Sequence, residues 1–160
     1  MAYHGTKSNF VTSILTQGFC SSTPTAEKVC CFLEFLGASA ALYLSPSIEY
    51  AAHPRYAVPI RWGAQWVQVV LQVRVNPNVL CSKMEGTLPG ARSIDPQLDP
   101  HFSNEELEWI VTAAPATYLT ASQGVIVSGI MLRFSDTHPY ENQKNNWWGP
   151  PDGTYWSMHN

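Results

Sequence analysis

The sequence predicts an α+β domain whose sheet is largely antiparallel. Helical patterns occupy the first part of the chain and strand patterns come later, which is the order that favours this fold class. The length of 160 residues suits one domain, and a hydrophobic content of 45% is ample material for a core. We therefore expect residues 1–160 to form a single domain.

The first fifty residues predict two helices, a short strand and a third, very short helix. Residues 8–17 carry an apolar stripe and end at Gly18, a natural position for a helix stop. A Thr-Pro pair is typical of a helix start, so a second helix is expected over 24–36. Residues 41–44 then favour a strand, and the Ser-Pro-Ser turn that opens 45–51 starts a short helix.

The second half of the chain is richer in strand patterns. Residues 66–75 alternate between aliphatic and polar side chains, which indicates a strand with one buried face. Strands are also expected over 107–113 and 125–134, and the second of these is almost continuously apolar, so we expect it to be buried. The proline-rich stretch 76–104 reads as loops. Residues 135–160 have no period and are rich in Asn, Pro, Gly and Trp.

We expect that final segment, 135–160, to be a strap whose tryptophan rings pack on the domain. The alternative is that the rings form an exposed aromatic surface for a partner or an acceptor. Lys144 is the one Lys or Arg of the segment, which argues against base stacking on nucleic acid.

Sparse charge excludes several classes of protein. Charged residues make up 13% of the chain, and the net charge is −3 at pH 7. A nucleic-acid binder that neutralises many phosphates, or a polybasic membrane-surface module, needs far more basic residues. The chain shows no secretion signal and no apolar run of about 18 residues, so we expect an intracellular protein, cytoplasmic or nuclear, without a membrane anchor. Its four cysteines form no C-x-x-C pair, so reduced thiols and no metal site are expected.

Three short segments carry the candidate chemistry: YHGT at 3–6, LYLSPSIEYA at 42–51 and NEELEWIV at 104–111. Each of them alone has an ordinary structural interpretation, such as a packed aromatic ring or a solvated acidic edge. Glu108 is the unusual residue, because it falls inside an apolar strand. A carboxylate in that position either faces solvent or lines a cleft.

Together and in this order, the segments resemble the ADP-ribosyltransferases of the poly(ADP-ribose) polymerase type, which carry a His-Tyr-Glu triad. The matching residues here are His4, Tyr43 and Glu108, and the resemblance extends over most of residues 1–134. It implies two split antiparallel sheets with a few short helices. It also implies an enzyme that transfers ADP-ribose from NAD to an acceptor, which we expect to be a protein, and releases nicotinamide.

The resemblance further implies how NAD would be held. His4 and Thr6 would bind the ribose on the adenosine side, and the backbone of Gly5 would pair with the nicotinamide carboxamide. Tyr43 would pack on one face of the nicotinamide ring. Glu108 would bind the 2′-hydroxyl of the nicotinamide ribose.

Two further residues belong to this predicted binding site. Ser47 and Tyr50 are three residues apart, so on a helix they share a face. The Ser47 hydroxyl would bond to the carboxamide, and the Tyr50 ring would stack on the nicotinamide ring. Tyr56 is the alternative to Tyr50 for the stacking role. Cleavage of the nicotinamide–ribose bond passes through an oxocarbenium-like state, which a carboxylate such as Glu108 stabilises by its charge.

Two other functions remain open. Water could be the main acceptor, which would make the protein an NAD glycohydrolase, or the cleft could be a catalytically silent module that binds NAD, ADP-ribose or a partner. Within the transferase interpretation, the small domain favours transfer of single ADP-ribose units. A Rossmann dinucleotide site and a P-loop are not supported, because neither glycine motif is present.

Overall fold

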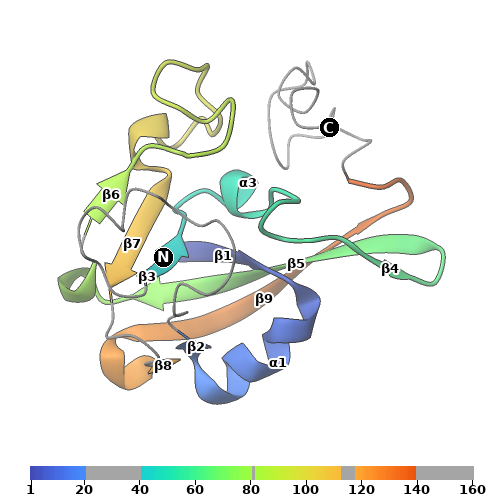
Figure 1. The fold of residues 1–160 in the computed structure, drawn as a ribbon, viewed down its shortest axis with the longest axis horizontal. Helices are drawn as coiled ribbons and strands as arrows, with labels where there is room; N and C mark the ends of the chain where they lie inside the picture. Colours follow the sequence, from blue (N-terminus) through green and yellow to red (C-terminus); the bar gives the residue numbers. More distant parts are fainter. Residues whose placement is uncertain (21–40, 81, 113–117, 140–160) are drawn as a thin grey trace.

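The computed structural model describes residues 1–20, 41–80, 82–112 and 118–139, and Figure 1 shows their arrangement. These ranges form antiparallel sheets with a few short helices, as the α+β prediction requires. The helix expected over 24–36 lies outside the described residues, as does the tail from residue 140 onward.

The larger sheet is organised around the long strand β5 (Gln65–Val75). Strands β1 (Ala2–Thr6) and β4 (Ile60–Trp62) pair antiparallel with β5, and so does β9 (Val125–Ser135), which follows it over almost its whole length. The two long strands predicted from the sequence are therefore confirmed.

The smaller sheet carries the second and third sequence segments. Its order is β3 (Ala41–Leu44), β7 (Glu108–Thr112) and β6 (Ser82–Met84), all antiparallel. The short helix α3 (Ile48–Ala51) follows β3, and the Ser47 side chain caps it by accepting a hydrogen bond from the Tyr50 N–H. The strand predicted over 41–44 and the short helix after it are confirmed.

The remaining elements are small. Helix α1 (Ser8–Gln17) is confirmed as predicted, and β2 (Phe19–Cys20) pairs with β8 (Tyr118–Leu119). Three short 3₁₀ turns complete the description: η1 (Pro77–Val79), η2 (Asn104–Glu106) and η3 (Ala121–Gln123). In the described ranges, no helix has the length and apolar content needed to cross a lipid bilayer.

The two sheets meet at one backbone bridge, which joins Tyr3 of β1 to Ser45, the residue directly after β3. The Tyr3 N–H donates to the Ser45 carbonyl at 2.7 Å, and the Ser45 N–H donates to the Tyr3 carbonyl at 2.9 Å. No other ladder pair joins β1 to β3 in the described chain. The sheets are therefore split next to this bridge, which leaves room for side chains from both of them to line a cavity.

Both faces of β5 are covered at its centre. On one face, Val69 and Leu71 belong to the largest apolar cluster. The opposite face was predicted to be polar, but Gln68 is only 1% exposed. Its amide donates to the carbonyl oxygens of Ala52 at 3.0 Å and Ala57 at 2.8 Å, because α3 and the turn after it cover this face. The polar residue is thus an internal link between the sheet and α3.

The prediction that strand 125–134 is buried is wrong. Ile130, Leu132 and Phe134 are exposed by 47%, 50% and 52%. These residues alternate along β9 and so share one face, which no described element covers; β9 also lies at an edge of the larger sheet, because it pairs only with β5 among the described strands. An apolar run indicates a strand, but it does not say whether another element covers it.

The long connection between β6 and β7 is held by the side chain of Asn104, which is buried. Its amide oxygen accepts from the Leu98 N–H at 3.0 Å. Its amide nitrogen donates to three carbonyl oxygens of the loop, those of Arg92, Asp95 and Pro96. The backbone carbonyl of Asn104 also takes part and accepts a hydrogen bond from the Gly86 N–H at 3.0 Å. One side chain therefore replaces the backbone pairing that this irregular loop lacks.

We expect Asn104→Ala to lower the free energy of unfolding by about 2–3 kcal/mol, because several buried backbone groups lose their partner at once. Denaturant unfolding monitored by circular dichroism measures this. The matched control is Asn78→Ala at an exposed position of η1, which should change stability by less than about 0.5 kcal/mol. Equal effects of the two changes would contradict the role given to Asn104.

Candidate functional site

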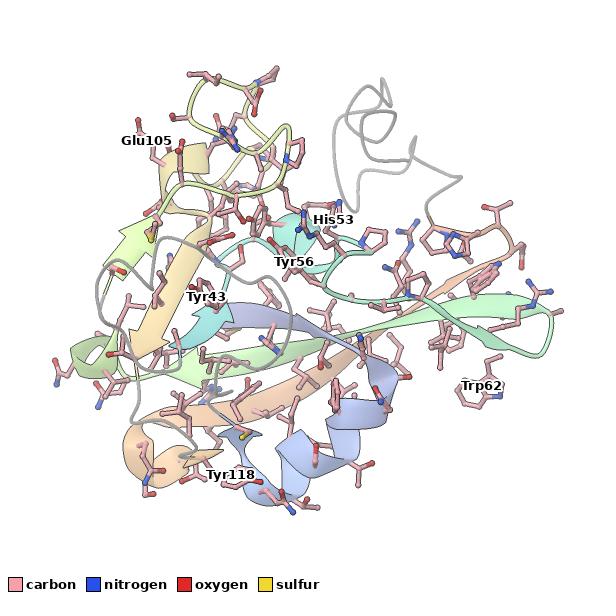
Figure 2. All side chains as sticks on the ribbon, in the orientation of Figure 1. Tyr43, His53, Tyr56, Trp62, Glu105 and Tyr118 are labelled. Carbon is pink, nitrogen blue, oxygen red and sulfur yellow. The ribbon has the colours of Figure 1, made fainter. Side chains whose placement is uncertain are left out.

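A cavity of about 380 Å³ opens where the two sheets split. Its walls include His4 from β1, Tyr43 from β3 and Glu108 from β7. Tyr56, from the turn after α3, adds a further ring. Figure 2 shows Tyr43 and Tyr56 near the middle of the molecule, whereas Trp62 lies near the far end of the β4 hairpin.

The structure brings together five of the seven site residues predicted from the sequence. The five that line the cavity are His4, Gly5, Tyr43, Tyr50 and Glu108. The other two, Thr6 and Ser47, are buried outside its lining. The hydroxyl of Ser47 is the N-cap of α3 and accepts from the Tyr50 N–H at 3.3 Å, so its local role is to begin the helix that carries Tyr50.

His4 joins the two sheets through its side chain. Its Nδ1 lies 3.0 Å from the carbonyl oxygen of Tyr43, and since a carbonyl only accepts, Nδ1 carries the proton. Burial lowers the pKa of His4 by more than the hydrogen bond to Tyr43 raises it, so the ring is neutral near pH 7. Nε2 is then unprotonated and able to accept a hydrogen bond from a hydroxyl group.

Gly5 is required by the packing of α3 against β1. A Cβ atom at this position would lie 2.7 Å from the Cβ of Tyr56 and closer still to the carbonyl oxygen of Ala51. The sequence suggested that Gly5 allows the close approach of a ligand. The structure adds a second reason, because even a methyl group would push α3 and Tyr56 away from the cavity.

Only one of the neighbouring glutamates belongs to the site. Glu105 is exposed at η2, away from the middle of the molecule (Figure 2), and Glu106 forms an ion pair with Lys83 at 3.0 Å. Glu108 is 5% exposed and lines the cavity. The sequence left two positions open for this carboxylate, facing solvent or lining a cleft, and the structure has the second.

The carboxylate of Glu108 is held through one oxygen. Its Oε1 accepts from the hydroxyl of Tyr50 at 2.5 Å and from that of Thr87 at 2.6 Å, with the Thr87 N–H at 3.3 Å and the Tyr56 hydroxyl at 3.5 Å. Oε2 receives no hydrogen bond from any residue in the described ranges. The carboxylate therefore has one oxygen bound by the protein and one left for a ligand.

Tyr50 and Tyr56 differ in what they can offer. Tyr50 is 3% exposed, and this burial is the main reason why the pKa of its phenol is raised well above the ordinary value. The neighbouring Tyr56 and Glu108 raise the pKa further. Its phenol therefore stays protonated and donates to Glu108. Tyr56 is only partly buried, with its ring centroid 5.6 Å from that of Tyr50. Tyr56 is thus the better placed of the two to present a ring face to a ligand.

Sequence reasoning missed two residues of the lining, Thr87 and Arg55. Thr87 lies in the long loop after β6, where no periodic pattern marks any residue. Arg55 is exposed and is the one Lys or Arg among the lining residues that the structure describes. A cation in the wall of a cavity can attract an anionic ligand. In the sequence, the positive charge of Arg55 was the only signal that could have marked it.

A second ionisable group lies on α3 beside the site but outside the cavity lining. Burial, together with the neighbouring Asp99, raises the pKa of Glu49 to about 7, and Arg133 opposes the shift. Glu49 therefore changes its charge near neutral pH. This matters for any pH profile measured on the site.

Within the described ranges, no three His, Cys, Asp or Glu side chains gather where they could hold a metal ion. No protein-family model and no curated protein matches this chain.

Proposed function

We propose that the protein is an NAD-dependent ADP-ribosyltransferase whose cavity binds NAD, transfers single ADP-ribose units to a protein acceptor and releases nicotinamide. One observation carries the proposal. His4, Tyr43 and Glu108 come from three strands far apart in the sequence, yet they line one cavity. They do so where two antiparallel sheets split, which is the arrangement that the resemblance to ADP-ribosyltransferases implies.

The chemistry of the lining suits the reaction. The bond between ribose C1′ and the nicotinamide nitrogen breaks, its electron pair leaves with nicotinamide, and C1′ develops oxocarbenium character. The Glu108 carboxylate supplies negative charge beside that centre, and its Oε2 accepts the ribose 2′-hydroxyl. The acceptor nucleophile then bonds to C1′ and releases its proton to water.

The other residues hold the substrate. The Nε2 atom of His4 accepts a hydrogen bond from a ribose hydroxyl, and the backbone of Gly5 pairs with the carboxamide. Tyr43 and Tyr56 provide aromatic surfaces for the nicotinamide ring. Arg55 supplies a positive charge for the diphosphate, which is the anionic part of NAD.

We expect Glu108→Gln to reduce nicotinamide release by at least about 10²-fold, because the charge that stabilises the oxocarbenium is lost. NAD binding, followed by calorimetry, should change little. Glu105→Gln, the same change at an exposed position three residues away, is the control and should keep full activity. An unchanged rate of release in Glu108→Gln would exclude Glu108 as the catalytic carboxylate.

A protein acceptor is distinguished from water by measuring labelled protein and free ADP-ribose in one reaction, with NAD labelled in its adenosine half. A transferase converts most of the NAD that it consumes into labelled protein. A glycohydrolase releases the same nicotinamide but leaves the label as free ADP-ribose. No release at all, with NAD raising the melting temperature, would indicate a binding module instead.

We expect kcat/KM for NAD to show no inflection from His4 at or above about pH 6.5, the ordinary histidine pKa, since kcat/KM reports the free enzyme. Burial lowers the pKa of His4, so the acceptor form of Nε2 persists through this range, and activity falls only at more acidic pH. The profile is measured in Glu49→Gln, which removes the group with pKa about 7. An inflection near 6.5 in that variant would contradict a buried, neutral His4.

A further inference from the structure

The loop after β6 brings Thr87 against the carboxylate of Glu108. The Thr87 hydroxyl donates to Oε1 at 2.6 Å, and the Thr87 N–H lies 3.3 Å from the same oxygen. That N–H also donates to the hydroxyl of Tyr50 at 2.8 Å. One residue of the loop thus contacts both the carboxylate and the tyrosine that binds it.

The hydroxyl protons of Tyr50 and Thr87 both point towards one oxygen, Oε1 of Glu108. The Tyr50 hydroxyl accepts from the Thr87 N–H and donates its own proton to Glu108 Oε1 at 2.5 Å. The Thr87 hydroxyl reaches Oε1 from the loop. Hydrogen bonds from neutral donors to a carboxylate are short and strong, so together they fix the rotation of the carboxyl group.

The backbone around Thr87 is fixed, although its own side chain is exposed. On one side, the Gly86 N–H donates to the Asn104 carbonyl, and a Cβ on Gly86 would lie 2.8 Å from the Cβ of Ala91. On the other side, Leu88 is buried in a cluster that includes Tyr50. The Thr87 hydroxyl is therefore presented to Glu108 by its neighbours.

We propose that Thr87 is a positioning residue for the transfer reaction: by holding Oε1 it directs Oε2 of Glu108 towards the nicotinamide ribose. This inference rests on the function proposed above. Without the Thr87 hydroxyl, the carboxyl group loses one of its two short hydrogen bonds and keeps only the one from Tyr50 beside two longer contacts, so it can rotate away from the reacting centre. Displacement of a reacting group by about 1 Å can cost about 10²-fold in rate.

The kinetic test uses Thr87→Val and Thr87→Ser. Valine keeps the shape of threonine without the hydroxyl, and we expect about a 10- to 100-fold lower kcat for nicotinamide release with KM for NAD changed less than about twofold. Serine keeps the hydroxyl and should retain most of the wild-type kcat. Thr12→Val, on the exposed part of α1, is the matched control and should have wild-type kinetics.

A second measurement needs no NAD. Melting temperatures are compared for wild type, Thr87→Val, Glu108→Ala and the double variant, which together form a double-mutant cycle. If the hydroxyl binds the carboxylate, Thr87→Val lowers the melting temperature in the wild-type background and has a smaller effect once Glu108 is replaced. Additive effects would overturn the contact, whatever the activity.

The outcomes separate the two proposals. Non-additive melting with an unchanged kcat in Thr87→Val would overturn the positioning role and leave the transferase function standing. Equal loss of kcat in Thr87→Ser and Thr87→Val would also overturn it, because the hydroxyl would then not be responsible. If wild type releases no nicotinamide, the proposed function fails and the positioning role with it, while the cycle still reports the contact.

Discussion

The backbone bridge between Tyr3 and Ser45 is the contact on which the rest of the site depends. It holds one strand of each sheet together at a single position, and the side chain of His4 reinforces it by bonding to the Tyr43 carbonyl. Continuous pairing between β1 and β3 would close the space between the sheets. With one bridge, the sheets stay joined but open beside it, and polar side chains can face a cavity without being packed in the core.

Local sequence signals predicted much of this arrangement. Alternation and apolar runs located the long strands, the turn at 45–47 located α3, and a carboxylate within an apolar strand singled out Glu108. These features are set by residues close together in the sequence. The resemblance that the three segments carry together then suggested that His4, Tyr43 and Glu108 act together, and all three line one cavity.

The features that could not be predicted depend on which element covers which face. Gln68 is internal because α3 lies over it, and Phe134 is exposed because no described element covers its face of β9. The local sequence pattern predicts neither fact, because the same residues are compatible with a sheet face that is exposed and with one that another element covers. Thr87 and Asn104 act from an irregular loop, where hydrogen bonds between side chains and backbone replace any repeat that a sequence could reveal.

The register of the sheets also has a consequence for how the chain folds. Ala2 pairs with Val73 and Ala41 with Thr112, so most strand pairs join distant parts of the chain, and β4 with β5 is the one local hairpin among the described ladders. Closing such long loops costs entropy before any contact repays it, which slows folding. During synthesis β1 leaves the ribosome long before its partner β5. Strand β1, which carries His4, therefore waits unpaired, and the cavity can form only after Glu108 has emerged.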